Sequence, residues 1–180
     1  MNKPMSDFHF KLMSSIGIKI RNLFLSPAKI IKEVKIEPGF QVLDFGCGPG
    51  YFTIMAAEIV GESGKVYALD IHPLAAKMVE KRAKKKKLAN VKTILSDCQT
   101  GLPDNTMDVI LFYDTFHLLS EPNKVLVELH RVLKPNGILS FSDHHMKEDE
   151  IISKVTNREL FRLSRKGKRT YSLLKEEPKK

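Results

Sequence analysis

Apolar runs of about five residues alternate with stretches of helical periodicity through the middle of the chain. The runs predict strands over residues 40–44, 65–70, 91–95, 108–113 and 138–142. The intervening stretches predict helices over residues 51–60, 73–87 and 122–133. Apolar strands that alternate with helices are typical of a parallel sheet covered by helices on both faces.

The N-terminal 25 residues precede this alternation. They predict an amphipathic helix, because apolar side chains recur at helical spacing at Leu12, Met13, Ile16, Ile20, Leu23 and Phe24. Ser26-Pro27 then predicts the start of a short second helix. No insertion between the strands offers another cover, so the N-terminal helix is the candidate lid over a site, with Phe8, His9 and Phe10 closing over it. Plain packing of this helix on the domain is the alternative.

The C-terminal part ends the alternation. A predicted helix over 148–158 is followed by two short strands, 160–163 and 170–174, which flank Lys166-Gly167-Lys168 as the strands of a hairpin would. The chain therefore predicts a doubly wound α/β fold, with a mostly parallel seven-stranded sheet and an antiparallel hairpin at its C-terminal edge.

A length of 180 residues favours one domain with a sizeable core. We expect the N-terminal helix over 1–25, a ligand-binding core over 26–145, and the C-terminal helix and hairpin over 146–180. Two cysteines, Cys47 and Cys98, exclude a disulfide framework and a Cys-rich zinc site. No stretch approaches the ~20 apolar residues that span a bilayer. We therefore expect no membrane span and a cytoplasmic location.

The net charge is +9, from 30 basic and 21 acidic residues. Such a balance is compatible with nucleic acid, an anionic membrane surface or an acidic substrate as partner. One cluster of basic residues lies on the helix predicted after the second strand, where positive charge near the solvated C-terminal end is favourable. It comprises Lys77, Lys81, Arg82 and Lys84 to Lys87. A second cluster surrounds the hairpin and would suit an anionic acceptor; it comprises Arg158, Arg162, Arg165, Lys166, Lys168 and Arg169.

A glycine-rich loop between the first strand and its helix carries the strongest functional signal. Its glycines, spaced G-x-G-x-G, allow a tight turn and close approach to a ligand at the carboxyl edge of the sheet. A dinucleotide-binding loop would have a further glycine at position 51, where this chain has Tyr51. Asp44 precedes the loop, and no lysine or arginine lies between Asp44 and Tyr51. This charge pattern disfavours a pyrophosphate and suits a cation, such as the sulfonium and ammonium of S-adenosylmethionine.

Two further carboxylates follow the second and third strands. Asp70 stands 20 residues after Gly50, where a carboxylate can accept hydrogen bonds from ribose hydroxyls of either NAD or S-adenosylmethionine. Asp97, beside Cys98, could accept from an adenine amine. Each residue also has a purely structural explanation: Asp70 as a helix cap, Asp97 as a solvated loop residue, and the glycines as turn formers.

Five segments, in this order, resemble the class I S-adenosylmethionine-dependent methyltransferases, most closely the small-molecule branch that includes quinone-biosynthesis enzymes. The segments are VLDFGCGPG (42–50), ALD (68–70), SDC (96–98), GLPDNTMDVILF (101–112) and RVLKPNGIL (131–139). The resemblance covers roughly residues 27–142 and implies a Rossmann-like methyltransferase fold with S-adenosylmethionine as cofactor.

The resemblance also implies where each part of the cofactor lies. The methionine part is expected against the loop residues Asp44, Gly46, Cys47, Gly48 and Gly50, with Cys47 as a small packing residue and no nucleophile. The ribose is expected at Asp70, with Ile71 beside it, and adenine between Asp97 and Cys98. Tyr113 or Asp114, after the fourth strand, is expected to face the transferring methyl group.

Methyl transfer from a sulfonium is an in-line displacement, for which the protein supplies proximity, alignment and a dry site. It requires no universal catalytic residue, and we assign none firmly. The candidates are Tyr113 and His117, the latter as a general base; packing beside Leu118 and Leu119 is the alternative for His117. Asp143-His144-His145 ends the fifth strand on the same side. Adjacent side chains on an extended chain point to opposite faces, so we expect no metal site there.

A small-molecule acceptor is the main hypothesis for the substrate. The loop Phe112-Tyr113-Asp114-Thr115 departs from the N-P-P-Y pattern of enzymes that methylate amino groups of nucleic-acid bases. One alternative is an RNA or protein methyltransferase that docks its acceptor through the basic hairpin. Another is a non-catalytic module that binds S-adenosylmethionine and regulates a partner. NAD-dependent reduction is disfavoured by Tyr51 and Asp44.

Overall fold

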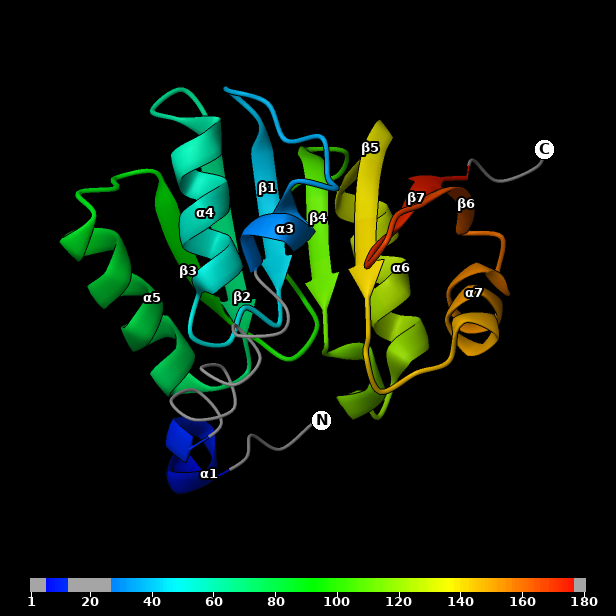
Figure 1. Ribbon diagram of the computed structural model, residues 1–180, viewed down its shortest axis with the longest axis horizontal. Helices are drawn as coiled ribbons and strands as arrows, with labels where there is room; N and C mark the ends of the chain where they lie inside the picture. Colours follow the sequence, from blue (N-terminus) through cyan, green and yellow to red (C-terminus); the bar gives the residue numbers. More distant parts are fainter. Residues whose placement is uncertain (1–5, 13–26, 177–180) are drawn as a thin grey trace.

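A computed structural model describes residues 6–12 and 27–176 (Figure 1). Its helices are α1 (Asp7–Leu12), α3 (Pro27–Ile31), α4 (Tyr51–Val60), α5 (Pro73–Lys85), the 3-10 helix η2 (Phe116–Leu118), α6 (Pro122–Val132) and α7 (Glu148–Thr156). Its strands are β1 (Gln41–Phe45), β2 (Lys65–Asp70), β3 (Val91–Leu95), β4 (Met107–Tyr113), β5 (Leu133–Ser142), β6 (Phe161–Lys166) and β7 (Tyr171–Lys175). None of the helices in these two ranges is long and apolar enough to cross a membrane.

The seven strands form one sheet in the order β3-β2-β1-β4-β5-β7-β6. The five strands from β3 to β5 are parallel, whereas β7 runs antiparallel to β5 and pairs with β6 as a hairpin. This confirms the predicted mostly parallel sheet with an antiparallel edge hairpin. The strand order reverses between β1 and β4, and ligands of open α/β sheets bind beyond the carboxyl ends of the strands at such a point.

Helices cover both faces of the sheet because side chains alternate along its strands. On β1, Leu43 and Phe45 pack in a cluster with residues of α6 and α7, whereas Val42 packs with residues of α3 and α4. Figure 1 shows α3 and α4 in front of the sheet and α6 behind it. The strands of the centre are therefore apolar on both sides, which is why they appear in the sequence as uninterrupted apolar runs.

The sequence misplaced the start of the fifth strand. We predicted a turn at Pro135-Asn136-Gly137, before a strand over 138–142, but β5 already begins at Leu133. Leu133 pairs with Met107 as α6 ends, and the register then shifts before Ile138 pairs with Val109. The segment from Pro135 to Gly137 lies in this irregularity, where a proline without an N–H group is tolerated.

Other helix and strand boundaries lie a few residues from the predicted ones. The helix predicted over 73–87 ends at Lys85, and Lys87 takes a positive φ of 57°, which a helix cannot continue through. The helix predicted over 148–158 ends at Thr156. The hairpin strands are displaced towards the C-terminus relative to the prediction. Between them, the Gly167 amide donates to the Thr170 carbonyl at 2.7 Å.

Only a small part of the predicted N-terminal helix lies within the described residues. Its apolar positions from Met13 to Phe24 lie outside them. Helix α1 precedes this segment and lies at the lower edge of Figure 1, on the side of the carboxyl ends of β1 and β4. Phe10 is buried there and stacks on His72, with ring centroids 4.2 Å apart, whereas Phe8 is exposed. The lid function of this helix stays a prediction.

Candidate functional site

The glycine loop is fixed at the carboxyl end of β1. The amides of Gly46 and Cys47 both donate to the Leu69 carbonyl of β2, at 2.8 and 2.9 Å. Gly46 and Gly50 have positive φ values of 74° and 81°. A Cβ at Gly46 would overlap the Thr115 side chain, and one at Gly50 would lie 2.6 Å from Val79 Cγ2. These two positions require glycine both for backbone conformation and for space.

Gly48 differs from its two neighbours in the loop. It also has a positive φ, of 51°, but a Cβ added there would meet no atom within 4 Å. Its amide donates to Asp70 Oδ2 at 2.8 Å. The loop is therefore packed against the protein at Gly46 and Gly50 and faces open space at Gly48, as expected of a loop that supports a ligand.

Asp70 connects the loop to the start of α5. Its Oδ2 accepts from the Gly48 amide, and its Oδ1 accepts from the His72 amide, each at 2.8 Å. Burial raises the pKa of Asp70, while the two amide hydrogen bonds oppose that rise. A carboxylate oxygen can accept more than one hydrogen bond. Each oxygen therefore keeps capacity to accept a further hydrogen bond, and the contact of Asp70 with a ribose hydroxyl stays a prediction.

Asp44 is placed differently from Asp70. It is only 3% exposed, and the Thr53 hydroxyl of α4 donates to its Oδ2 at 2.5 Å. Burial raises the pKa of Asp44 to about 7, although the hydrogen bond from Thr53 opposes the change. The carboxyl group thus faces α4, and its contact with the methionine part of a cofactor stays a prediction.

The remaining loop residues fall into buried and half-buried positions. Cys47 is buried with Phe10 and residues of α5, and this burial raises the pKa of its thiol well above the ordinary value. A thiol held neutral in this way is a packing group and a poor nucleophile. Ile71, Asp97 and Cys98 are half-buried after β2 and β3. Their contacts with ribose and adenine stay predictions.

Tyr113, at the end of β4, has its hydroxyl in the core. It is 7% exposed, its ring packs on Phe52 of α4 with centroids 4.8 Å apart, and its hydroxyl lies 2.7 Å from Ser140 Oγ. Burial raises the pKa of this phenol, and the hydrogen bond with Ser140 does not reverse the change. A hydroxyl with these partners is not placed to take a proton from an acceptor.

His117 lies on η2, just after β4, and is paired with Asp143, just after β5. The two side chains meet through His117 Nδ1 and Asp143 Oδ2, 2.8 Å apart. Tyr113 and Ser142 pair at the ends of these parallel strands, which brings the two loops together. The sequence singled out both residues but not their contact, because the contact depends on this register.

Two further histidines extend the same group. The ring of His145 lies 4.2 Å from that of His117 and 3.9 Å from that of His144, centroid to centroid. His144 Nδ1 in turn lies 2.7 Å from Asp114 Oδ1. Within residues 6–12 and 27–176, no three His, Cys, Asp or Glu side chains are arranged to hold a metal ion.

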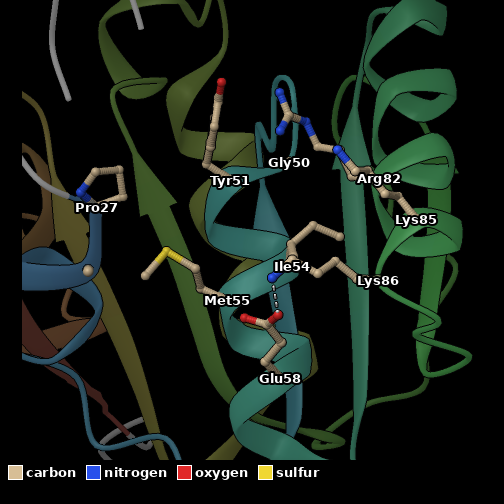
Figure 2. A pocket seen from close by; sticks show the side chains of 10 residues that line it. Pro27, Gly50, Tyr51, Ile54, Met55, Glu58, Arg82, Lys85 and Lys86 are labelled. Carbon is tan, nitrogen blue, oxygen red and sulfur yellow. Dashed lines mark ion pairs between the residues drawn. The ribbon is translucent and has the colours of Figure 1, made fainter. Parts of the chain in front are cut away.

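A basic groove lies beside the glycine loop, between α4 and α5 (Figure 2). It has a volume of about 480 Å³. The Arg82 guanidinium lies 4.2 Å from the centroid of the Tyr51 ring, and Lys86 pairs with Glu58 at 2.9 Å. Gly50 is its only wall residue among those predicted to bind the cofactor, so this groove is not the predicted cofactor site.

The fold and the loop define a class of protein: the sheet order, the glycine loop after β1 and the carboxylate at the end of β2 are those expected of class I methyltransferases. Residues 36–177 match a family model described as a methyltransferase domain. The chain belongs to this methyltransferase domain family, and the resemblance stated from the sequence is confirmed.

Curated relatives show which enzymes of this family the chain is similar to. The chain is 34% identical over 131 residues to a demethylmenaquinone methyltransferase of Geobacillus stearothermophilus, a match that covers 72% of this chain and 56% of that protein. It is 30% identical over 135 residues to the ubiquinone/menaquinone biosynthesis C-methyltransferase UbiE of a Marinomonas strain, covering 74% and 54%. The chain therefore spans about half the length of these curated relatives.

Solved structures give the same fold. A SAM dependent methyltransferase from Aquifex aeolicus superposes with a TM-score of 0.79 at 29% identity, over 96% of this chain and 98% of that one. The [4+2]-cyclase SpnF superposes with a TM-score of 0.67 at 19% identity, over 77% and 56%. The second likeness is one of fold alone, and it illustrates that this fold does not by itself fix the reaction.

Proposed function

We propose that this protein is an S-adenosylmethionine-dependent methyltransferase that methylates a small aromatic acceptor of the quinol type. The observation that carries the proposal is the glycine loop bound to Asp70 through the Gly48 amide, in a chain whose residues 36–177 match the methyltransferase domain family. The names of the relatives, which refer to menaquinone and ubiquinone, support an acceptor of the quinone–quinol type.

The residues present fit S-adenosylmethionine. The cradle is made of glycines, two of which leave no space for a Cβ. The carboxyl groups of Asp44 and Asp70 lie next to it. Gly46, Gly48 and Gly50 would hold the methionine part, Asp70 and Ile71 the ribose, and Asp97 and Cys98 the adenine. When bound, the cofactor supplies an electrophilic methyl group on a sulfonium.

The chain itself would position the acceptor and exclude water. Thr115 packs on Gly46, so the loop after β4 lies directly beside the cofactor loop. The acceptor would enter beyond the ends of β4 and β5, where η2 and the Asp143-His144-His145 segment lie. Holding the acceptor in line with the transferring methyl group can lower the barrier by up to about 7–11 kcal/mol.

The experiment is a transfer assay with methyl-labelled S-adenosylmethionine. The acceptors are a short-chain 2-prenyl-1,4-naphthoquinone reduced to its quinol, the same compound left oxidised, and an aromatic amine of similar size. We expect label in the quinol product only, with a mass increase of one methylene. Transfer to the amine alone, or to none of the three while the cofactor binds, would contradict the quinol acceptor.

The alternative of a nucleic-acid or protein acceptor docked on the hairpin receives less support. Three of its six cations are engaged within the protein: Arg162 pairs with Glu176, Lys166 with Glu148, and Arg165 donates to the Glu33 carbonyl. Cations paired in this way contribute less to binding phosphates. RNA binding that weakens with salt and is lost on charge reversal at Lys168 and Arg169 would favour this alternative.

A further inference from the structure

Asp143 is a carboxylate taken out of water at the end of β5. Its side chain is fully buried, whereas that of His117 is 23% exposed. It accepts from the backbone amides of His117 and His145, each at 3.1 Å, and it contacts His117 Nδ1 at 2.8 Å. A buried carboxylate needs such donors to offset its lost hydration. The three contacts therefore fix both the η2 backbone and the orientation of the His117 ring.

The contact with Asp143 also selects the tautomer of His117. A carboxylate accepts, so Nδ1 carries the proton, and the lone pair of the neutral ring is then on Nε2. The hydrogen bonds of His117 to other described residues run through its backbone amide and Nδ1, and none runs through Nε2. This arrangement, a partly exposed imidazole oriented by a buried carboxylate, is the one that general bases of this type require.

Helix η2 begins beside the glycine loop. Thr115, two residues before His117, is packed on Gly46 of the glycine loop. The titratable groups that surround His117 come from two loops: Asp143 and His145 contact it directly, and His144 and Asp114 lie one step further out. His144 pairs with Asp114, whose side chain is 21% exposed. His117 is therefore the imidazole of this group that a fully buried carboxylate orients.

We propose that His117 is the general base of this methyltransferase and that Asp143 is its positioning residue. This inference rests on the proposed function and deepens it: the acceptor carries a hydroxyl group, phenolic or enolic, that must lose its proton for transfer. An acceptor that is already a good neutral nucleophile, such as an amine, would have no use for this pair.

The proton and electron balance is simple. The acceptor hydroxyl gives its proton to His117 Nε2, and the electron pair left on the acceptor forms the new bond to the methyl carbon. The carbon–sulfur bond breaks, and its electron pair stays on sulfur. If the oxygen is methylated, His117 passes the hydroxyl proton to water. If a ring carbon is methylated, the imidazolium returns its proton to the oxygen, and the ring carbon loses its own proton to water as the ring regains aromaticity. Either reaction releases one proton.

The test compares the wild type with His117→Gln, which keeps an N–H donor for Asp143 but removes the base. With the reduced 2-prenyl-naphthoquinone, we expect kcat/KM to fall by about 10²–10⁴-fold, while the calorimetric affinity for S-adenosylhomocysteine changes less than about twofold. The wild-type rate should fall as pH decreases, because protonation removes the base. This dependence should be absent in His117→Gln. His130→Gln, which replaces an imidazole on α6 that contacts the Glu176 carbonyl, away from the loops after β4 and β5, is the matched control.

Acceptor acidity provides the discriminating comparison. A halogenated naphthol with a lower hydroxyl pKa is already partly ionised, so it should recover much of the lost rate in His117→Gln, and more so at higher pH. Asp143→Asn should lower kcat for the reduced 2-prenyl-naphthoquinone with little change in KM, because the imidazole loses the carboxylate that orients it. Equal loss for all acceptors with an unchanged pH profile would overturn the assignment of a base.

A second readout does not depend on turnover. Nitrogen-15 NMR of the His117 ring should show a proton on Nδ1 and none on Nε2 in the neutral wild type, and Asp143→Asn should abolish this preference. A proton on Nε2 would overturn the proposal. If the wild type binds S-adenosylmethionine but methylates no hydroxyl acceptor, this inference fails; if it does not bind S-adenosylmethionine at all, the proposed function itself fails.

Discussion

Replacing Gly46 with alanine tests whether the glycine loop is built as the structure indicates. The new Cβ would lie 2.7 Å from Thr115 Cγ2 and 2.9 Å from Thr115 Cβ, and closer still to its hydroxyl. The φ of +74° costs an L-residue roughly 1–2 kcal/mol, and forced overlap in a packed site costs typically 1–3 kcal/mol. We therefore expect Gly46→Ala to lower the free energy of unfolding by about 2–5 kcal/mol, a decrease in Tm of roughly 4–20 °C for a chain of this size.

Gly48→Ala is the matched control, because it shares the positive φ but meets no atom within 4 Å. Its expected cost in unfolding free energy is the backbone term alone, roughly 1–2 kcal/mol. Urea unfolding without ligand measures both variants. Thr115→Gly in the Gly46→Ala background should recover about 1–3 kcal/mol of coupling energy. Equal destabilisation by the two alanines, with no recovery in the double variant, would refute the packing of Thr115 on the loop.

Three further predictions concern carboxyl groups. Burial raises the pKa of Asp44 from 3.8 to about 7, so between these values the native state retains a proton that the unfolded chain releases. The free energy of unfolding should therefore fall as pH rises from about 4 to 7, by up to about 4 kcal/mol. Urea unfolding of Asp44→Asn should lack this decline. Partial burial favours the neutral form of Glu128, but hydrogen bonds from Arg131 and Thr100 lower its pKa to about 2. The stability that ionised Glu128 contributes should be present above about pH 4.5 and lost as pH falls through 2. Glu128→Gln should therefore lower Tm at pH 7 but not at pH 2. Asp70→Ala should weaken calorimetric binding of S-adenosylmethionine by at least about tenfold, through loss of hydrogen bonds to a charged group, and unchanged affinity would contradict its role at the ribose.

The parallel core was predictable because its strands are buried on both faces. An uninterrupted apolar run such as that of β4 leaves few alternatives once turn residues bound it. The glycine loop was predictable for a similar reason, since its position between a strand and a helix fixes which edge of the sheet it occupies. Its relation to Thr115 was not, because that contact joins residues about 70 positions apart in sequence.

The pairing of His117 with Asp143 shows where sequence reasoning stops. Both residues were noted as lying near the acceptor, but their contact depends on the register in which Tyr113 faces Ser142. A shift of that register would separate them without altering any local pattern. The error at Pro135 has the same origin, since the early pairing of Leu133 with Met107 draws a turn-like segment into the sheet.

Calorimetric titration with S-adenosylmethionine, S-adenosylhomocysteine and NAD decides whether the glycine loop and Asp70 form an S-adenosylmethionine site. Both sulfur nucleosides should bind the wild type, NAD should not, and His130→Gln should leave this pattern unchanged. Binding of NAD in preference to S-adenosylmethionine, or binding of neither sulfur nucleoside at millimolar concentration by folded protein, would contradict it.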